Sequence, residues 1–169
     1  MALFRIITPS APLRSGPFAN AALDSECLFG ESFETERSET GFAFGRLASD
    51  GYQGWVPDNC LGALPTPNAR VIVPMSDVTS QADIKSTGRF ALSLGALVTI
   101  TELQDDRAEI ITPNSSGFLP RQHLLPLASR TADDKAASHV LGDVTRVDDW
   151  VAIAEKLVAS PYKWGGRCA

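Results

Sequence analysis

The chain has 169 residues, of which 44% are hydrophobic, and its formal net charge at pH 7 is −5. This length allows one ordinary hydrophobic core or two small ones. Acidic and basic residues are interspersed without a basic run, which argues against a nucleic-acid-binding protein, because contact with a phosphate backbone needs clustered Lys and Arg.

Neither end of the chain reads as a targeting segment. The apolar run in residues 1–10 is short and is broken by Arg5, and nothing later approaches the roughly eighteen apolar residues of a membrane span. We therefore expect a cytoplasmic protein with no membrane partner. Cys27, Cys60 and Cys168 are odd in number and lack CxxC spacing, so the sequence predicts free thiols, no metal site and no cofactor.

The chain contains an internal duplication. Residues 28–35 align with residues 93–100, each as an apolar-Gly step into an alternating strand, and Gly30 and Gly95 are 65 positions apart. Residues 54–57 (GWVP) align with residues 117–120 (GFLP), 63 positions later. Two anchors at nearly the same offset indicate a repeat of about 64 residues.

Each copy is predicted to be all β. In the first copy, the strands are expected at residues 31–36, 42–47 and 52–57, with a hairpin turn at Ser49-Asp50-Gly51. In the second copy they are expected at residues 96–103, 107–111 and 117–119. Short strands at this spacing favour two small barrels of five or six strands, at residues 1–64 and 65–127, joined by the stiff connector at 65–68.

The remaining residues differ in composition. Residues 128–147 begin with small polar residues and are predicted to be a linker. A helix is expected over residues 148–159, with an apolar stripe at Val151, Ala154, Leu157 and Val158, ending before Pro161. One helix of this length cannot bury its own stripe, so the stripe must pack on the barrels, on a second copy of the chain, or on a further domain.

Two motifs together resemble a known family. The GYQGWV sequence at residues 51–56 resembles the end of a bacterial SH3 domain, and PYKWGG at residues 161–166 resembles the segment that closes the first helix of NlpC/P60 cysteine peptidases. In that order, they resemble cytosolic NlpC/P60 enzymes with two N-terminal SH3 domains. On this resemblance, residues 148–169 are the truncated start of an α+β, papain-like NlpC/P60 domain.

The resemblance implies that this chain lacks the catalytic residues. In the family the nucleophile follows PYxWGG after several residues, within an Asp-Cys-Ser-Gly stretch, and its histidine-region partners come later. Cys168 lies too early and has no preceding Asp, while His123 and His139 occupy no catalytic position of the family. A cysteine peptidase needs a thiolate held by an adjacent histidine, so we expect no catalytic residue here.

The resemblance also implies a substrate site. In related enzymes an acidic residue and a tyrosine of the first SH3 domain receive the free amine of the peptide's N-terminal L-Ala. By motif these are Glu31 and Tyr52, with Tyr162 nearby, where a carboxylate would pair with the ammonium while an aromatic face packs on the stem. Alternatively, Glu31 is an exposed charge at a strand start and Tyr52 a half-buried barrel residue. Trp55 is expected in a core, and Trp164 between the helix and a barrel.

Two functions follow. The first is the substrate-gating half of a hydrolase that cleaves the γ-D-Glu to diamino-acid bond in recycled murein peptides with a free N-terminal L-Ala. The second is a stand-alone binding or oligomerising module without turnover. The residues do not distinguish a natural short chain from a fragment, nor do they identify the third amino acid of the peptide.

Overall fold

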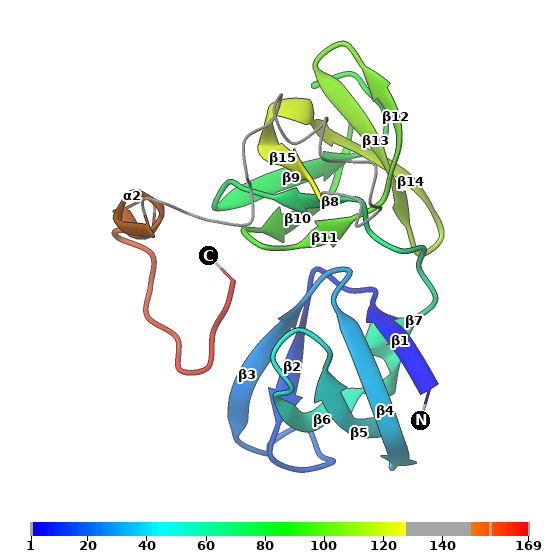
Figure 1. Ribbon diagram of the computed structural model, residues 1–169, viewed down its shortest axis with the longest axis vertical. Coiled ribbons are helices and arrows are strands. Elements are labelled where there is room, and N and C mark those ends of the chain that lie inside the picture. Colours follow the sequence, from blue (N-terminus) through cyan, green and yellow to red (C-terminus); the bar gives the residue numbers. More distant parts are fainter. Residues whose placement is uncertain (1, 128–149, 156, 169) are drawn as a thin grey trace, which may run out of the picture.

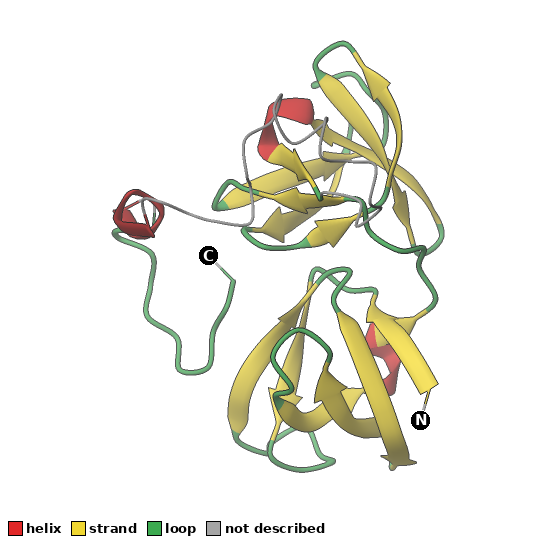
Figure 2. Ribbon diagram, viewed as in Figure 1, coloured by secondary structure: helices red, strands yellow, loops and turns green. Residues whose placement is uncertain are grey.

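The computed structural model describes residues 2–127, 150–155 and 157–168. Over these residues the chain is mainly β, and its short helices are minor elements (Figure 2). The linker predicted at residues 128–147 lies outside the described residues. No helix in the described ranges has both the length and the apolar character needed to cross a membrane.

The first unit, residues 2–62, forms one antiparallel sheet (Figure 1). Its seven strands within the described residues follow the order β3-β2-β6-β5-β4-β1-β7, and the 3₁₀ turn η1 precedes β7. The elements are β1 (Ala2–Ile6), β2 (Ser10–Arg14), β3 (Leu23–Leu28), β4 (Ser32–Glu39), β5 (Phe42–Leu47), β6 (Gln53–Pro57), η1 (Asp58–Cys60) and β7 (Leu61–Gly62).

The second unit, residues 69–126, divides its described strands between a five-stranded sheet, β10-β9-β14-β13-β12, and a three-stranded sheet, β11-β8-β15. The elements are β8 (Ala69–Val71), β9 (Met75–Thr79), β10 (Gly88–Ser93), β11 (Leu97–Val98), β12 (Ile100–Gln104), β13 (Arg107–Thr112), β14 (Ser115–Pro120), η2 (Arg121–His123) and β15 (Leu124–Pro126). Each unit has more strands than the five or six expected, because two-residue strands such as β7 and β11 are too short to show any alternation.

The duplication is visible in backbone hydrogen bonds. The amide of Gly30 donates to Ile6 at 2.8 Å, and the amide of Gly95 donates to Val71 at 2.9 Å. Both glycines have positive φ, 78° and 92°, in turns that a residue with a Cβ adopts only with strain. At the other end of each unit a strand closes with proline and enters a 3₁₀ turn, β6 into η1 and β14 into η2. The sequence anchors therefore mark equivalent backbone geometry.

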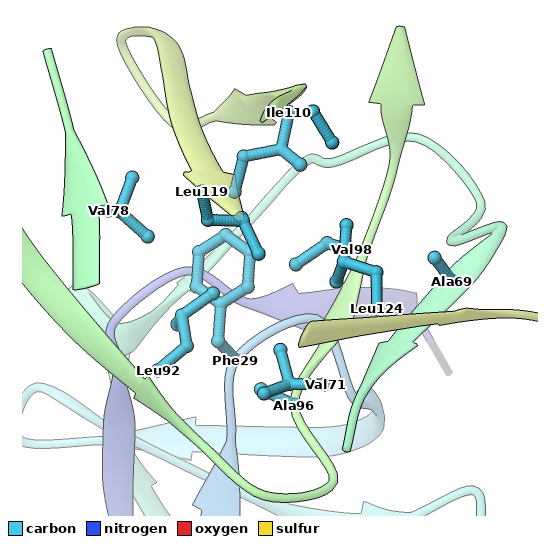
Figure 3. Close-up of a cluster of buried hydrophobic side chains, with 11 residues drawn as sticks. Phe29, Ala69, Val71, Val78, Leu92, Ala96, Val98, Ile110, Leu119 and Leu124 are labelled. Carbon is cyan, nitrogen blue, oxygen red and sulfur yellow. The ribbon is translucent and has the colours of Figure 1, made fainter. Parts of the chain in front are cut away.

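Each unit has its own buried cluster, but the second unit's cluster is completed by the first unit. Phe29, which follows β3, is 1% exposed and lies among the buried side chains of the second unit (Figure 3). Its carbonyl accepts a 2.8 Å hydrogen bond from the amide of Leu97. Burying a phenylalanine contributes about 1.5–3 kcal/mol, so the two units stabilise one another. The cluster of the first unit comprises Ile6, Ala11, Leu13, Cys27, Phe33, Ala43, Leu47, Val56 and Cys60.

Aromatic residues of the first unit occupy the positions expected of packing groups. Trp55 is 7% exposed, and its ring lies 5.2 Å from that of Phe44. The guanidinium of Arg37 stacks over both rings, 4.1 Å from the centroid of Phe44. The predicted packing role of Trp55 is confirmed.

The predicted C-terminal helix over 148–159 is wrong in its length. Helix α2 covers only Trp150–Glu155. Leu157 donates to Ala154, and Val158 donates to Glu155, through backbone bonds of the tighter three-residue type, and Ala159 has a φ of 73°. These turns end the helix before Pro161, whose ring disfavours helical geometry in the preceding residue. Residues 148, 149 and 156 lie outside the described ranges.

The apolar stripe of that segment faces solvent. Val151 is 46% exposed, Leu157 37% and Val158 76%, while Trp164, which was expected to pack the helix against a barrel, is 74% exposed. The prediction for Trp164 is therefore wrong. With so few turns, α2 presents too little apolar area to hold an indole against a sheet.

The junction between the units makes a strong prediction for Gly30→Ala. A Cβ on Gly30 would lie 1.9 Å from the carbonyl oxygen of Leu97, whereas a Cβ on Gly41, which also has positive φ, would meet nothing within 4 Å. Gly41→Ala is expected to lower the free energy of unfolding by about 1–2 kcal/mol, the cost of a left-handed non-glycine residue. Gly30→Ala should lose about 1–3 kcal/mol more, because the two units must move apart.

Urea unfolding of both variants, followed by circular dichroism, measures the difference. Equal losses for the two variants would contradict a tight junction at Gly30, since the backbone strain is common to both.

Candidate functional site

The C-terminal segment 163–168 lies along β3, the edge strand of the first unit (Figure 1). It is held by Glu26, which is 4% exposed. The ammonium of Lys163 forms an ion pair with Glu26. The backbone amides of Arg167 and Cys168 donate to the same carboxylate at 2.9 and 3.3 Å. One buried side chain of an edge strand thus binds three donors of a segment about 140 positions away.

Glu31 forms the second half of this contact. The guanidinium of Arg167 donates to both of its carboxylate oxygens, at 3.0 and 2.8 Å, and also to the carbonyl of Glu26 at 3.0 Å. Such bidentate pairs are among the stronger hydrogen-bonded contacts in proteins. Glu31 is 6% exposed, so the alternative that it is an exposed strand-start charge is wrong.

The local backbone fixes the Glu31 carboxylate. Glu31 follows Gly30, whose positive φ reverses the chain, and its amide donates to the carbonyl of Leu28 at 3.1 Å. The amide of Leu28 donates in return to Oε2 of Glu31 at 2.8 Å. Among the described residues, Oε2 accepts two hydrogen bonds and Oε1 accepts one, so one of about four acceptor positions of the carboxylate, on Oε1, receives no donor there.

Gly165, the first of the two glycines before Arg167, allows the close approach to β3. Gly165 has a φ of 68°, and a Cβ there would lie 3.0 Å from the carbonyl carbon and oxygen of Asp24 in β3. Gly165 therefore lets the segment run against the backbone of β3 at a distance that a side chain would prevent. The PYKWGG motif, noted in the sequence as a family resemblance, also has this local physical function.

The charges of the site perturb several pKa values. Burial acts to raise the pKa of Glu26, but hydrogen bonds from Lys163, Arg167 and Cys168 outweigh it and hold the pKa below its ordinary value. Burial acts to lower the pKa of Arg167, and the hydrogen bond and charge of Glu31, together with the charge of Asp50, raise it overall. Both groups therefore stay ionised at neutral pH.

Asp50 brings a further negative charge to the site. Glu26, Glu31 and Asp50 provide three carboxylates, and Lys163 and Arg167 provide two cations. Arg5 adds a third cation beside this turn, since its guanidinium donates to the carbonyl of Gly30 at 3.1 Å and to the hydroxyl of Ser32 at 2.6 Å.

The predicted site residues do not all meet. Tyr52 is 48% exposed. Its backbone amide donates to the carboxylate of Asp50 at 2.9 Å, so Tyr52 lies in the same turn as one of the charged residues of the site. Tyr162 is 86% exposed and lies next to Lys163 in the chain. Among the described residues, neither tyrosine hydroxyl forms a hydrogen bond with Glu31.

Sequence reasoning missed Glu26, Lys163 and Arg167. Glu26 lies in a strand whose alternation gave no signal, and a buried carboxylate has no sequence signature when its partner is distant. Lys163 and Arg167 flank the Gly-Gly pair, and their positive charges could have suggested an acidic partner on the first unit.

The cysteines are not arranged as nucleophiles. Burial raises the pKa of Cys27 to about 12, with the charge of Glu31 adding to it. Burial also raises the pKa of Cys168, which lies near Ser10 of the first unit and Ser93 of the second. Both thiols are therefore kept protonated near neutral pH.

The histidines offer Cys168 no base within the described residues. His123 is hydrogen-bonded through Nδ1 to the hydroxyl of Ser76 at 2.9 Å. His139 lies outside the described residues. The three cysteines that were expected to be unpaired are free thiols, and no cluster of three or more metal-ligating side chains occurs in the ranges that the structure describes.

Comparison with known proteins gives one family match, within the first unit. Residues 13–61 match the model of the bacterial dipeptidyl-peptidase Sh3 domain. No curated protein sequence matches the chain significantly.

Solved structures extend the likeness to the whole chain. An NlpC/P60 family protein from Bacillus cereus ATCC 10987 superposes with a TM-score of 0.73 at 14% identity, over 98% of this chain and 66% of the other. This chain therefore spans slightly less than two thirds of that protein. NlpC1 and NlpC2 from Trichomonas vaginalis match at TM-scores of 0.32 and 0.33, with 17% and 16% identity, 72% and 78% of this chain and 44% and 51% of theirs. Those two scores are too low to support an argument.

These findings agree with the resemblance drawn from the GYQGWV and PYKWGG motifs. The chain has a segment that matches a bacterial Sh3 domain, and its fold is similar to that of an NlpC/P60 family protein.

Acid is expected to release the C-terminal segment. Because the pKa of Glu26 is lowered in the folded chain, its contacts contribute stability that is complete above the ordinary glutamate pKa of about 4.3 and is lost as the pH falls below it. The amide resonance of Arg167 should shift over that acid range in a ¹H–¹⁵N spectrum, while that of Val56, inside the first sheet, stays in place. An unshifted Arg167 amide in folded protein at the acid end would contradict this.

Proposed function

We propose that the chain is the N-terminal, substrate-gating portion of an NlpC/P60-type cysteine endopeptidase that acts in the cytoplasm on recycled murein peptides. The bond cleaved by the whole enzyme would be the one between γ-D-Glu and the diamino acid. The Sh3 match at residues 13–61 and the fold shared with the Bacillus cereus protein support this proposal.

In this proposal both units, residues 1–64 and 65–127, are SH3-type domains. The equivalent turns at Gly30 and Gly95, and the equivalent strand-to-3₁₀ passages after Pro57 and Pro120, support a common origin. Residues 148–169 would then be the beginning of the catalytic domain.

The observation that carries the proposal is the buried carboxylate of Glu31, one of whose acceptor positions receives no donor among the described residues. An α-ammonium carries one positive charge and three N–H donors, and it can bind the open acceptor position on Oε1 while Arg167 keeps its bonds. A peptide whose N-terminus is acylated carries no positive charge there and has at most one N–H donor, so it would bind this carboxylate more weakly.

The two tyrosines would complete the site. Tyr52 and Tyr162 are exposed, so their rings are free to pack on the stem of the peptide behind the ammonium. Together with Glu31 they would restrict the enzyme to peptides that begin with a free L-Ala.

The chain by itself is proposed to lack turnover. A thiol whose pKa is raised is ionised to at most a few per cent at pH 7, and no histidine among the described residues assists Cys168. The competing function, a binding or oligomerising module with no catalytic role, has the same binding site. The two differ only in whether a catalytic domain acts on the bound peptide.

The binding site is tested with the peptide L-Ala-γ-D-Glu-meso-diaminopimelate and its N-acetylated form, by isothermal titration. The free peptide should bind about 10- to 100-fold more tightly, since a charged hydrogen bond to a buried group contributes about 1.5–3 kcal/mol. Glu31→Gln should lose affinity for the free peptide by a similar factor. Glu34→Gln is the control, because Glu34 forms a surface ion pair with Arg46 and lies near Glu31 in the chain.

Equal affinities for the free and acetylated peptides would contradict the ammonium site. That comparison uses the unaltered protein, so it stands even if Glu31→Gln disturbs the fold.

Alkylation of the thiols tests the absence of a nucleophile. Iodoacetamide should modify Cys168 in the folded protein with a pH midpoint above the value of about 8.5 for a free cysteine, and Cys27 should react more slowly still. Mass spectrometry of tryptic peptides gives both rates. Hydrolysis of the peptide by purified protein that Cys168→Ala abolishes would overturn the proposal that this chain has no turnover.

A further inference from the structure

A pocket lies on the second unit and shares no residue with the Glu26–Glu31 site. It has a volume of about 480 Å³. It is formed where the β12–β13 hairpin meets the end of β14 and the start of η2. The lining residues are Ile84, Asp105, Asp106, Arg107, Pro120, Arg121 and Gln122.

Arg107 is the unusual member of this lining. It is 6% exposed, and its Nη2 donates to the hydroxyl of Thr79 at 2.5 Å and to the carbonyl of Phe118 at 3.1 Å. Its Nε is buried without a hydrogen-bond partner, and Nη1 donates to no group among the described residues. Among the described residues no carboxylate forms an ion pair with this guanidinium, and a charged group that is largely buried without a counter-ion is costly.

The equivalent position in the first unit has an apolar residue in place of this arginine. In the first unit Phe42 lies opposite Pro57 in the β5–β6 ladder, and in the second unit Arg107 lies opposite the equivalent Pro120. Packing at this ladder position is therefore satisfied by an apolar ring in one copy. The buried cation of the other copy is not needed to build the sheet.

Three more charges border the pocket without forming ion pairs among the described residues. The side chains of Asp105, Asp106 and Arg121 make no salt bridge there, although the amide of Arg121 donates to the carbonyl of Asp106 at 2.8 Å. The hairpin turn, in which Asp105 has a φ of 33°, thus holds charges of both signs around one cavity. Two cations and two carboxylates line it in total.

We propose that this pocket binds a small zwitterion of the amino-acid type with an aliphatic side chain. Its carboxylate would bind Nη1 of Arg107 and the guanidinium of Arg121, and its ammonium would bind Asp105 and Asp106. The side chain would lie on Ile84, which is 79% exposed, and on Pro120. A simple anion fits less well, because the two carboxylates of the lining would repel it.

Leucine and two analogues, each lacking one of its charged groups, test the proposal by ¹H–¹⁵N titration of the whole chain. Leucine should shift the amides of Asp105 to Arg107 and of Arg121. The compounds 4-methylpentanoate, which lacks the ammonium, and isoamylamine, which lacks the carboxylate, should each bind at least about tenfold more weakly, the loss expected when one charged pair is removed.

Variants identify the groups. Arg121→Ala and Asp106→Asn, both at the rim, should each weaken leucine binding about tenfold, and Arg107→Lys should weaken it further if that variant folds. Arg70→Ala, an exposed arginine of β8 outside the pocket, is the control and should bind as the unaltered chain does.

Absence of shifts at millimolar leucine would overturn the proposal. Equal binding of leucine and 4-methylpentanoate would overturn the zwitterion in favour of a plain anion site. Neither result bears on the ammonium site at Glu31, whose test uses a different ligand and different residues.

Discussion

The structure depends on one turn, residues 28–31, which serves both units at once. Phe29 enters the second unit's core, and Gly30 brings the backbone within contact of Leu97. Glu31, the next residue, receives Arg167 from the far end of the chain. The packing of the two units and the attachment of the C-terminal segment are therefore coupled through a few backbone torsions, and a change in one alters the other.

The two copies share their turns and strand ends but differ in the side chains at two of those positions. Where the first unit has Glu31 after its turn, the second has Ala96, and where the first has Phe42 opposite a strand-ending proline, the second has Arg107. Neither substitution changes the hydrogen bonds that build the sheets. Each one adds a charged group to a largely buried position, which is how a duplicated scaffold acquires two distinct sites.

The parts of the fold that could be predicted from sequence are those governed by local rules. The Gly-Trp-Val-Pro and Gly-Phe-Leu-Pro strands and the Ser49-Asp50-Gly51 hairpin follow from alternation and turn chemistry. Glu31 was predicted as a site residue from a family resemblance. Its partner Arg167 was not, because an ion pair between residues 136 positions apart depends on tertiary approach, which no local pattern encodes. The helix was predicted too long, since periodicity does not register the tight turns after Glu155.

Phe29 has a consequence for the order in which the molecule is made. The ribosome delivers the first unit before the second, so the completed first sheet presents a bare phenyl ring until β8 to β15 have been synthesised. That ring lies within the second unit's described core, with Leu64 packed against the same cluster, and it offers an apolar surface on which the later strands can pack. The early half of the chain thereby acts as a template for the late half.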